Sequence, residues 1–355
     1  MISRTEGMGL RKFTYGQAIA EALVQAMDDD PNVFIMGIGV DDAKGIFGTT
    51  LPASKKYGGT RVIETSACEN CITGMALGMA MNGKRPVIVH ARNDFSFLAM
   101  DQMFNYAAKW QYMFGGHAPH VPIVVRNIIG KGWGQGATHS QNLMAVYGHF
   151  PGLHVLAPSC AYDAKGMLIH SLRGSVPTVL FEHRSLYDHV SDVPENMYEE
   201  MPGRAQIIRE GKDVSLIAMS WMVPEALKAA FALEDLGVSA EVLDLRSIRP
   251  LDESAITASV AKTGRVLCAD AGWMRFGVSA EIEAVIASNP VVQKLKCPIR
   301  RVGMADCPAP VSRVLEDAFY ADHRTIFAAV LAMMGRDSAI QYEWPEKIET
   351  FKGPY

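Results

Sequence analysis

The chain has 355 residues, of which 49% are hydrophobic and 20% charged, and its formal net charge is −4. It contains no sustained Lys/Arg stripe, which disfavours nucleic acid or an anionic membrane as a partner. It also lacks an apolar run of the roughly 20 residues that span a bilayer and an N-terminal apolar segment of signal-peptide type, so we expect a soluble, cytoplasmic protein.

Helical and apolar segments alternate through the first half of the chain. A helical pattern at 15–29 precedes the apolar run 33–40, and the alternation continues through 61–65, 69–82, 86–90, 96–110, 121–127, 154–158, 161–173 and 178–182. Helices that alternate with buried strands predict an α/β fold with a mainly parallel sheet. We expect this first domain to span residues 12–190.

A second, smaller α/β domain is predicted at 205–335, after a polar, proline-containing linker at 191–204. Its strands are expected at 213–220, 239–245, 265–270 and 299–303, and its helices at 222–236, 253–262 and 277–288. The tail 336–355 is polar and aromatic, with Tyr342, Trp344, Phe351 and Tyr355. It is expected either to fray or, as we favour, to bury these aromatics against another subunit.

The most informative segment is RVIETSACENCITGMALGMAMNG at 61–83. A strand at 61–65 ends just before a helix whose predicted apolar face comprises Ile72, Ala76, Met79 and Ala80. Glu69 then lies in the first helical turn, near exposed backbone N–H groups. A carboxylate delivered from a strand end into a helix start is placed for cofactor chemistry.

The six cysteines are scattered, which predicts reduced thiols and not a disulfide framework. Cys68 and Cys71 form a C-x-x-C, the pattern of a redox pair or of half a zinc site. No second C-x-x-C or H-x-x-H accompanies it, so a metal site is disfavoured. We interpret the two as small buried thiols that pack beside Glu69, with a redox or metal role as the alternative.

Three other groups join Glu69 near predicted strand ends of the first domain. They are HARNDFSF at 90–97, the glycine-rich GKGWGQGATHSQ at 130–141, and the histidines His117, His120, His139 and His149. Ligands of open parallel sheets bind outside the carboxyl ends of the strands, so we expect one site there. The glycine-rich segment lacks GxGxxG and Walker spacing, so its glycines are interpreted as allowing close backbone approach and Lys131 as solvated, not as a phosphate ligand.

His139 is the histidine best suited to acid/base chemistry or to donation toward a developing oxyanion. A capping or solvated role weighs equally on the residues alone. His149 precedes a Pro-Gly turn and is expected to be structural, and nothing fixes His117 or His120 near the site. No Ser/His/Asp, H-E-x-x-H, EF-hand, Walker or dinucleotide motif stands in a suitable context, which disfavours common hydrolases and dehydrogenases.

From residue 12 to about residue 335 the chain resembles a known family. The resemblance is carried by ordered blocks, among them YGQAIAEAL at 15–23, TGMALGMAMNGKRPV at 73–87, MDQMFNYAAKW at 100–110, THSQ at 138–141 and LDLRSIRPLD at 243–252. These blocks are similar to the beta subunit of the thiamine-diphosphate-dependent first component of 2-oxo acid dehydrogenase complexes, of the pyruvate, branched-chain and acetoin types. That subunit belongs to the transketolase-like superfamily. The resemblance implies a pyrimidine-binding domain followed by a transketolase C-terminal-like domain.

The resemblance also implies roles for individual residues. Glu69 matches the acidic residue that hydrogen-bonds a ring nitrogen of the cofactor's aminopyrimidine. That bond favours the imino tautomer, whose nitrogen removes the proton from the thiazolium carbon. Phe95 matches the aromatic that stacks on the pyrimidine, Ala67 and Ala91 match neighbouring cofactor contacts, and His139 matches the histidine that assists acyl transfer to a lipoyl group.

Some residues depart from the family pattern. Cys71 stands at a usual Gly and Leu98 at a usual Gln, and the run before Phe95, normally apolar and aromatic, reads HARND, in which His90, Arg92 and Asp94 add polarity. We interpret this polarity as altered substrate or acceptor preference, with contacts to a partner subunit as the alternative.

The metals of the family are expected mainly outside this chain. Mg²⁺ and the cofactor's diphosphate are held in the family by a G-D-G…N-N motif, which is absent here. That motif belongs to the alpha subunit, so the resemblance implies an α2β2 heterotetramer with each cofactor at an α/β interface. A structural K⁺ (potassium) ion would bind backbone carbonyls of 171–177, where Gly174 and Val176 replace the usual Asp and Asn.

The leading hypothesis is therefore a beta subunit that, with an alpha partner, binds thiamine diphosphate and Mg²⁺, decarboxylates a 2-oxo acid and passes the acyl group to the lipoyl carrier of an acyltransferase. The alternative is half of a split transketolase or acyloin-forming synthase, which delivers the carbanion to an aldehyde. A third hypothesis is a non-catalytic scaffold, which Glu69, Phe95 and His139 argue against. The residues do not identify the 2-oxo acid.

Overall fold

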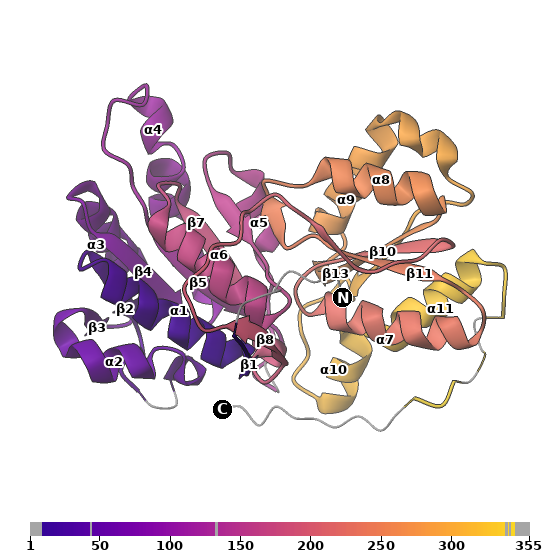
Figure 1. The fold of residues 1–355 in the computed structure, drawn as a ribbon, viewed down its shortest axis with the longest axis horizontal. Coiled ribbons are helices and arrows are strands. Elements are labelled where there is room, and N and C mark those ends of the chain that lie inside the picture. The colour runs from indigo at the N-terminus through magenta and orange to yellow at the C-terminus, as the bar shows by residue number, and fades with distance from the viewer. Residues whose placement is uncertain (1–8, 43–44, 132–133, 338–339, 341, 345–355) are drawn as a thin grey trace.

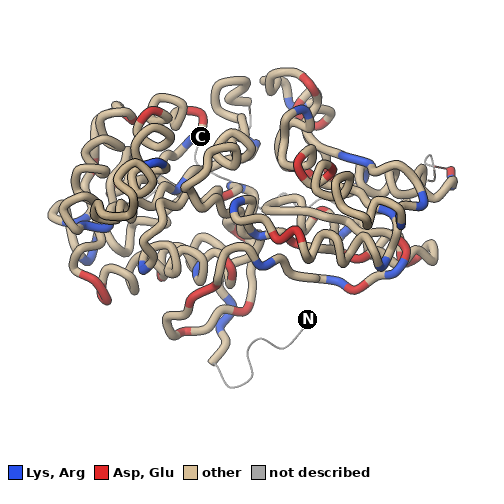
Figure 2. Tube along the Cα trace, turned by 90° about the horizontal axis from the view of Figure 1, so that it is seen from above, with Lys and Arg blue, Asp and Glu red and all other residues tan. Residues whose placement is uncertain are grey.

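The computed structural model of the chain describes residues 9–42, 45–131, 134–337, 340 and 342–344. Two α/β halves lie side by side, the first in indigo to magenta and the second in orange to yellow (Figure 1). Lys and Arg are interspersed with Asp and Glu along both halves (Figure 2). Among the described residues, no helix has the length and apolar character needed to cross a membrane.

The first half is built on a seven-stranded sheet with the order β12-β6-β7-β5-β4-β2-β3. Six of its strands run parallel: β2 (Val33–Gly37), β3 (Val62–Glu64), β4 (Arg85–His90), β5 (Val124–Ile129), β6 (His154–Leu156) and β7 (Thr178–His183). These strands are short runs rich in Val and Ile, as expected for a sheet covered on both faces. The predicted mainly parallel α/β fold is confirmed.

Helices cover both faces of this sheet. On one face lie α1 (Tyr15–Asp29), α2 (Leu51–Tyr57) and α6 (Ala161–Arg173), and on the other α3 (Glu69–Met81) and α5 (Met144–His149). The single helix predicted at 96–110 is instead divided into the 3-10 helix η3 (Asn93–Ala99), the π-helix η4 (Asp101–Ala107) and α4 (Trp110–Met113). The hydroxyl of Ser96 donates to the Asn93 carbonyl at 2.6 Å, which tightens the first turn of η3.

The second half contains a five-stranded sheet with the order β14-β13-β10-β11-β9. Its strands are β9 (Gln206–Arg209), β10 (Val214–Ala218), β11 (Ala240–Asp244), β13 (Val266–Trp273) and β14 (Arg300–Met304). Two helices, α8 (Glu253–Thr263) and α9 (Val278–Ser288), lie on one side of it (Figure 1). The other side carries α7 (Met222–Asp235), α10 (Arg313–Phe319) and α11 (His323–Met333).

The two halves share a sheet, buried ion pairs and a hydrophobic core, in addition to the connecting segment. Strand β12 (Ser247–Arg249) follows β11 in the chain, yet it pairs antiparallel with β6 and so completes the first sheet. Beside it, the buried Arg246 guanidinium contacts carboxylate oxygens of Asp163 at 2.5 Å and Glu200 at 2.6 Å. One hydrophobic core runs continuously from the α3 face of the first sheet into the second half.

The segment predicted as a linker packs on the first half. Its start forms β8 (Val190–Pro194), which pairs antiparallel with β1 (Leu10–Thr14). Further along, the ring of Tyr198 stacks on that of Tyr162 with centroids 4.6 Å apart, and its hydroxyl donates to the Tyr162 carbonyl at 2.8 Å. These apolar contacts hold the segment against α6.

Two tail aromatics also pack on their own chain, which differs from the expectation of contacts to another subunit. The ring of Trp344 lies 4.5 Å from that of His323 and 5.4 Å from that of Phe327, centroid to centroid. The Tyr342 hydroxyl donates to Asp235 at 2.6 Å. These rings cover the apolar surface of α11, whereas Phe351 and Tyr355 lie outside the described residues.

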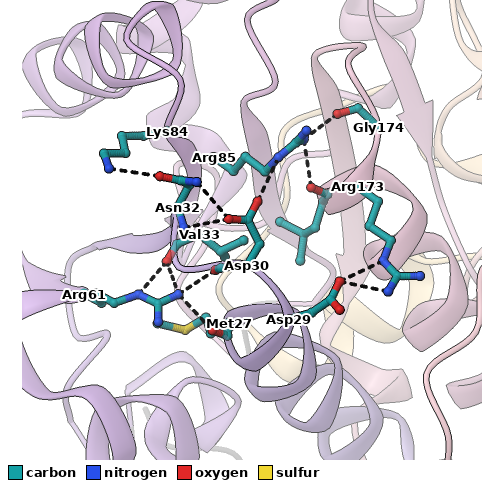
Figure 3. A network of polar contacts seen from close by, with 11 residues as sticks. Met27, Asp29, Asp30, Asn32, Val33, Arg61, Lys84, Arg85, Arg173 and Gly174 are labelled. Atoms are coloured by element: carbon teal, nitrogen blue, oxygen red, sulfur yellow. Dashed lines mark hydrogen bonds and ion pairs between the residues drawn. The ribbon is translucent and has the colours of Figure 1, made fainter.

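A polar network ties together the edge of the first sheet at which its parallel strands begin (Figure 3). The Arg61 guanidinium, just before β3, donates to the carbonyls of Met27, Asp30 and Val33 at 2.8–3.1 Å. At the start of β4, Arg85 pairs with the Asp30 carboxylate at 3.2 Å. This edge is therefore closed by structural contacts, and the opposite edge is left for a site.

Candidate active site

The carboxyl ends of β3, β4 and β5 meet at that opposite edge, because these strands are parallel and lie close together in one sheet. Glu69 follows β3, Phe95 follows β4 and His139 follows β5. The carboxyl edge of an open parallel sheet is the usual place for a ligand crevice.

Glu69 is the first residue of α3, as the sequence pattern predicted, and only 8% of its surface is exposed. The main-chain carbonyl of Glu69 accepts a hydrogen bond from the Thr73 hydroxyl at 2.8 Å, which secures the first turn. No described residue donates a hydrogen bond to its carboxylate. The Glu69 oxygens are not among the buried polar atoms that lack a partner, so the carboxylate stays open to a ligand that offers an N–H.

Phe95 and His139 are brought together from separate loops. Their ring centroids are 5.3 Å apart and the rings are nearly perpendicular, at 82°. Phe95 keeps 39% of its surface exposed, which leaves a ring face for a planar ligand. The Thr138 hydroxyl and His139 Nδ1 are hydrogen-bonded at 3.0 Å, so Nε2 is the imidazole nitrogen available to a substrate.

Asp94 and Asn93, immediately before Phe95, hold the loop that carries His139. The Asp94 carboxylate accepts from the backbone N–H of Gln141 at 3.1 Å and from its side-chain amide at 3.0 Å. The Asn93 amide donates to the Gln141 carbonyl at 2.9 Å and accepts from the Leu143 N–H at 2.9 Å. Both side chains are buried. We refer to these contacts of residues 93–94 with residues 141–143 as the loop clamp.

Arg92 and His90, which also depart from the family pattern, are part of the packed structure of this chain. Arg92 donates twice to the side-chain oxygen of Gln135, at 3.0 and 3.1 Å. His90 is buried at the end of β4, and burial lowers its pKa to about 4. Its imidazole is therefore neutral near pH 7. The polar run thus contributes to the architecture of the site.

The second half contacts the same loop from its other side. Lys131 lies 3.2 Å from the Asp317 carboxylate and 3.7 Å from that of Glu316, so the expectation of a solvated lysine is wrong. The Gly134 N–H donates to Glu316 at 3.1 Å. Gly136 has φ +73°, and a Cβ there would lie 2.9 Å from Val311. Glycine is thus required for close approach, as predicted, but the neighbour is α10 and its preceding turn.

The remaining candidates are placed as follows. Ala67 is exposed after β3, two residues before Glu69. Ala91 is half-buried after β4, four residues before Phe95. His117, His120 and His149 are exposed, and His149 lies edge-on to the Phe150 ring.

The prediction that Cys68 and Cys71 are buried is wrong, because both are exposed. The packed side of α3 includes Glu69, Ile72, Ala76 and Ala80, whereas Cys71 in the first turn is exposed.

Buried charges in the middle of the sheet were not foreseen. Arg126 of β5 and Glu182 of β7 form a fully buried pair at 2.5 Å, and the Tyr187 hydroxyl donates to the same carboxylate at 2.7 Å. Next along the chain, Arg184 donates to the His139 carbonyl at 3.4 Å, and burial lowers the pKa of Arg184 to about 9. Charged residues inside the apolar runs VVRNII and TVLFEH were the available signal.

The described part of the chain contains no cluster of His, Cys, Asp and Glu suited to a metal ion. In the stretch expected to hold potassium, the carbonyls of Leu172 and Gly174 accept hydrogen bonds from Arg85 at 3.0 and 2.6 Å. Figure 3 shows this guanidinium directed at Gly174. A cationic group therefore already contacts two of these carbonyls, which is a poor fit for an additional ion.

Comparison with known families divides the chain into two matched parts. The family described as the transketolase pyrimidine-binding domain matches residues 11–189, and the transketolase C-terminal domain matches residues 203–326.

Curated relatives cover nearly all of the chain. The beta subunit of acetoin:2,6-dichlorophenolindophenol oxidoreductase from Cupriavidus necator is 38% identical over 334 residues, which is 91% of this chain and 98% of the relative. The mitochondrial pyruvate dehydrogenase E1 component subunit beta-1 of Arabidopsis thaliana is 40% identical over 318 residues, 88% of this chain and 87% of the relative.

A solved structure described as a split-gene transketolase, an inactive β4 tetramer, superposes with a TM-score of 0.73. It covers 91% of this chain and 98% of that chain at 21% identity. At this identity the likeness establishes the shared fold alone.

Proposed function

The chain belongs to the transketolase-like family of thiamine-diphosphate-dependent 2-oxo acid dehydrogenase beta subunits, and from this we propose that it acts with an alpha subunit to decarboxylate a 2-oxo acid and pass the acyl group to a lipoyl carrier. The observation that carries the proposal is the convergence of Glu69, Phe95 and His139 on one sheet edge in a chain 38–40% identical to such subunits. These relatives favour the dehydrogenase over a split transketolase.

Glu69 would hold the aminopyrimidine end of the cofactor. Its carboxylate accepts no hydrogen bond from the described residues and is not fully buried, so it is open to the protonated ring nitrogen of an aminopyrimidine. When bound, thiamine diphosphate supplies the carbon nucleophile that attacks the 2-oxo acid. Glu69 contributes by holding a proton at the ring nitrogen, which favours the imino tautomer of the amino group.

Phe95 would contact the cofactor, and His139 would assist transfer of the acyl group. The exposed face of the Phe95 ring can stack on a planar pyrimidine, with Ala67 and Ala91 alongside because their small side chains allow close approach. His139 Nε2 can donate a proton to, or accept one from, the sulfur of the lipoyl acceptor. The loop clamp and Arg184 hold His139 in place while the acyl group moves.

The diphosphate end of the cofactor would be held by another chain. This sequence has no G-D-G…N-N motif, and no metal cluster occurs among the described residues. We therefore assign Mg²⁺ and the diphosphate to an alpha subunit carrying that motif, in an α2β2 assembly.

We assign no potassium ion to this chain, because Arg85 contacts the Leu172 and Gly174 carbonyls. Exchanging K⁺ for Na⁺ should therefore leave the melting temperature unchanged.

The test begins with the chain copurified with its alpha partner. The complex should reduce an artificial electron acceptor only when a 2-oxo acid is supplied. Product formation that requires an added aldehyde would instead support the acyloin-forming alternative. A complex that does not bind thiamine diphosphate would contradict both.

The role of Glu69 is tested separately with Glu69→Gln. The amide cannot hold the proton in the same way, so exchange of the thiazolium proton with deuterated water should slow by at least about 100-fold, measured by NMR after acid quench. The matched control is Glu64→Gln, which changes an exposed carboxylate at the end of β3 that accepts from the Gly39 and Val40 N–H groups. Near-normal exchange in Glu69→Gln would refute the assignment.

A further inference from the structure

The C-x-x-C that frames Glu69 has no part in the proposed reaction. Cys68 is the N-cap of α3 and Cys71 lies in its first turn, and both are exposed. Cys68 has the non-helical angles φ −152° and ψ 74° and makes no capping hydrogen bond with its side chain. In contrast, burial raises the pKa of the Cys160 and Cys268 thiols, which makes those two inert.

The two cysteines occupy positions that face each other at a helix start. An N-cap residue and the residue three positions later are the partners of a capping box. Helix α1 of this chain shows that arrangement: Thr14 at the N-cap and Gln17 at the third helical position exchange hydrogen bonds of 3.1 and 2.9 Å. In α3 the same two positions carry thiols, which have no capping bond to maintain.

We propose that Cys68 and Cys71 form a reversible intrachain disulfide that switches off the Glu69 site. The oxidant is a small disulfide of the glutathione class. One thiolate attacks it, forms a mixed disulfide and releases the first small thiol; the second cysteine then attacks the mixed bond and releases the second. Two electrons and two protons pass from the cysteine pair to the oxidant, so one small disulfide becomes two thiols.

The disulfide would disturb Glu69 because this residue lies between the two bonded cysteines in the chain. A disulfide requires Cβ atoms about 3.5–4.5 Å apart, and Cys68 is an N-cap residue with non-helical backbone angles. The bond would close a ring that contains Glu69, so it would constrain the backbone of the turn that carries this carboxylate. This consequence rests on the proposed function of Glu69, but disulfide formation itself does not.

A metal site at the same pair is the weaker assignment. Structural zinc takes four ligands, and two cysteines supply half of them. Across the described ranges, no group of three or more His, Cys, Asp and Glu residues is arranged to hold a metal. Thiol–disulfide exchange requires only the two side chains that are present.

The experiment treats the copurified complex with oxidised glutathione, alkylates the remaining thiols and maps the peptides by mass spectrometry. The peptide containing Cys68 and Cys71 should be unalkylated and lighter by two hydrogen atoms. Affinity for thiamine diphosphate, measured by calorimetry, should fall by about tenfold or more and return after dithiothreitol, since small displacements in a positioned site are costly.

Variants separate this disulfide from general oxidation. Cys68→Ser and Cys71→Ser should each keep full cofactor affinity in the presence of oxidised glutathione. Cys307→Ser, which removes an exposed thiol far along the chain, should lose affinity as the wild type does.

Two results would overturn the proposal. Glutathione attached separately to Cys68 and Cys71, with no bond between them, would refute the disulfide. A mapped disulfide that leaves cofactor affinity unchanged would refute the switch. If the reduced wild-type complex does not bind thiamine diphosphate at all, the proposed function and the switch both fail, while the peptide map still decides whether the disulfide forms.

Discussion

Asp94 contributes to the site without facing a ligand. The residue is 6% exposed, and its carboxylate accepts two hydrogen bonds from Gln141, two residues beyond His139. Because the next residue is Phe95, the loop clamp fixes the separation of the two aromatic rings at 5.3 Å. Asp94 is therefore a positioning residue.

Removing this carboxylate should affect acyl transfer more than decarboxylation. In Asp94→Ala the backbone N–H of Gln141 loses its acceptor, the His139 loop shifts, and acyl transfer to lipoamide should fall by about tenfold or more. KM for the 2-oxo acid should change little. Single-turnover assays that follow the two steps separately will measure this.

Two other variants calibrate that result. Asp94→Asn keeps an oxygen that can accept from the Gln141 N–H and should retain most of the transfer rate. His139→Ala should give the larger loss of transfer. Equal losses of decarboxylation and transfer in Asp94→Ala would mean that Asp94 supports the fold generally.

At the scale of elements, the corner between β11 and β12 carries a pH-sensitive carboxyl group. Asp244 is buried, accepts from the Arg246 N–H at 3.0 Å and contacts the Ser159 hydroxyl. Burial, together with the nearby Asp163, raises the pKa of Asp244 to about 7. Its folded pKa exceeds its unfolded value, so its contribution to stability is fully present below pH ~4 and is lost as pH rises through about 7.

An amide at this position should remove that loss. Asp244→Asn can still accept from Arg246 and donate to Ser159, and it carries no charge. We expect its melting temperature to exceed that of the wild type by a few degrees at pH 8 and by less at pH 5. A difference between the two proteins that does not vary with pH would show that Asp244 is not the titrating group.

Local elements were predictable from the sequence, and distant pairings were not. The start of α3 at Glu69 follows from the end of a β-branched run and from helical spacing, both within about 20 residues. The loop clamp joins residues 47 apart, and β12 crosses to a sheet formed by residues before 184. Periodicity describes which face of an element is apolar, but it does not specify the partner of a buried Asp or of an edge strand.

The same limit explains the error at the cysteines. Cys68 and Cys71 lie beside a buried carboxylate in the chain, which suggested that they share its burial. The packed side of α3 includes Glu69 and Ile72 but not the N-cap Cys68 or Cys71 between them, and both thiols are exposed. Whether a residue in the first turn of a helix is buried depends on loops that are distant from it in the sequence.

At the scale of the whole molecule, the two matched family segments pack as one structural unit. Strand β12 belongs to the first sheet, Arg246 bridges to Asp163 and Glu200, and one core passes through both halves. The residues that separate the two segments pack on α6 and do not span a gap.

A chain ending at residue 204 should therefore fail as an independent domain. It lacks β12 and leaves the edge of β6 and half of the shared core uncovered, so we expect aggregation and weak hydrogen-exchange protection in β6. The intact chain should show one thermal transition. Two well-separated transitions by calorimetry, or a soluble, protected fragment 1–204, would contradict this unity.

The position of β12 also sets an order of events on the ribosome. The six parallel strands of the first sheet have all been synthesised by residue 183, yet the edge of β6 stays unpaired until residues 247–249 have left the exit tunnel. Nascent domains fold N-terminal first, and an open strand edge invites pairing with a neighbouring chain. Translation of this protein therefore includes an interval of more than 60 residues in which the β6 edge of its first sheet is open to pairing with a neighbouring chain.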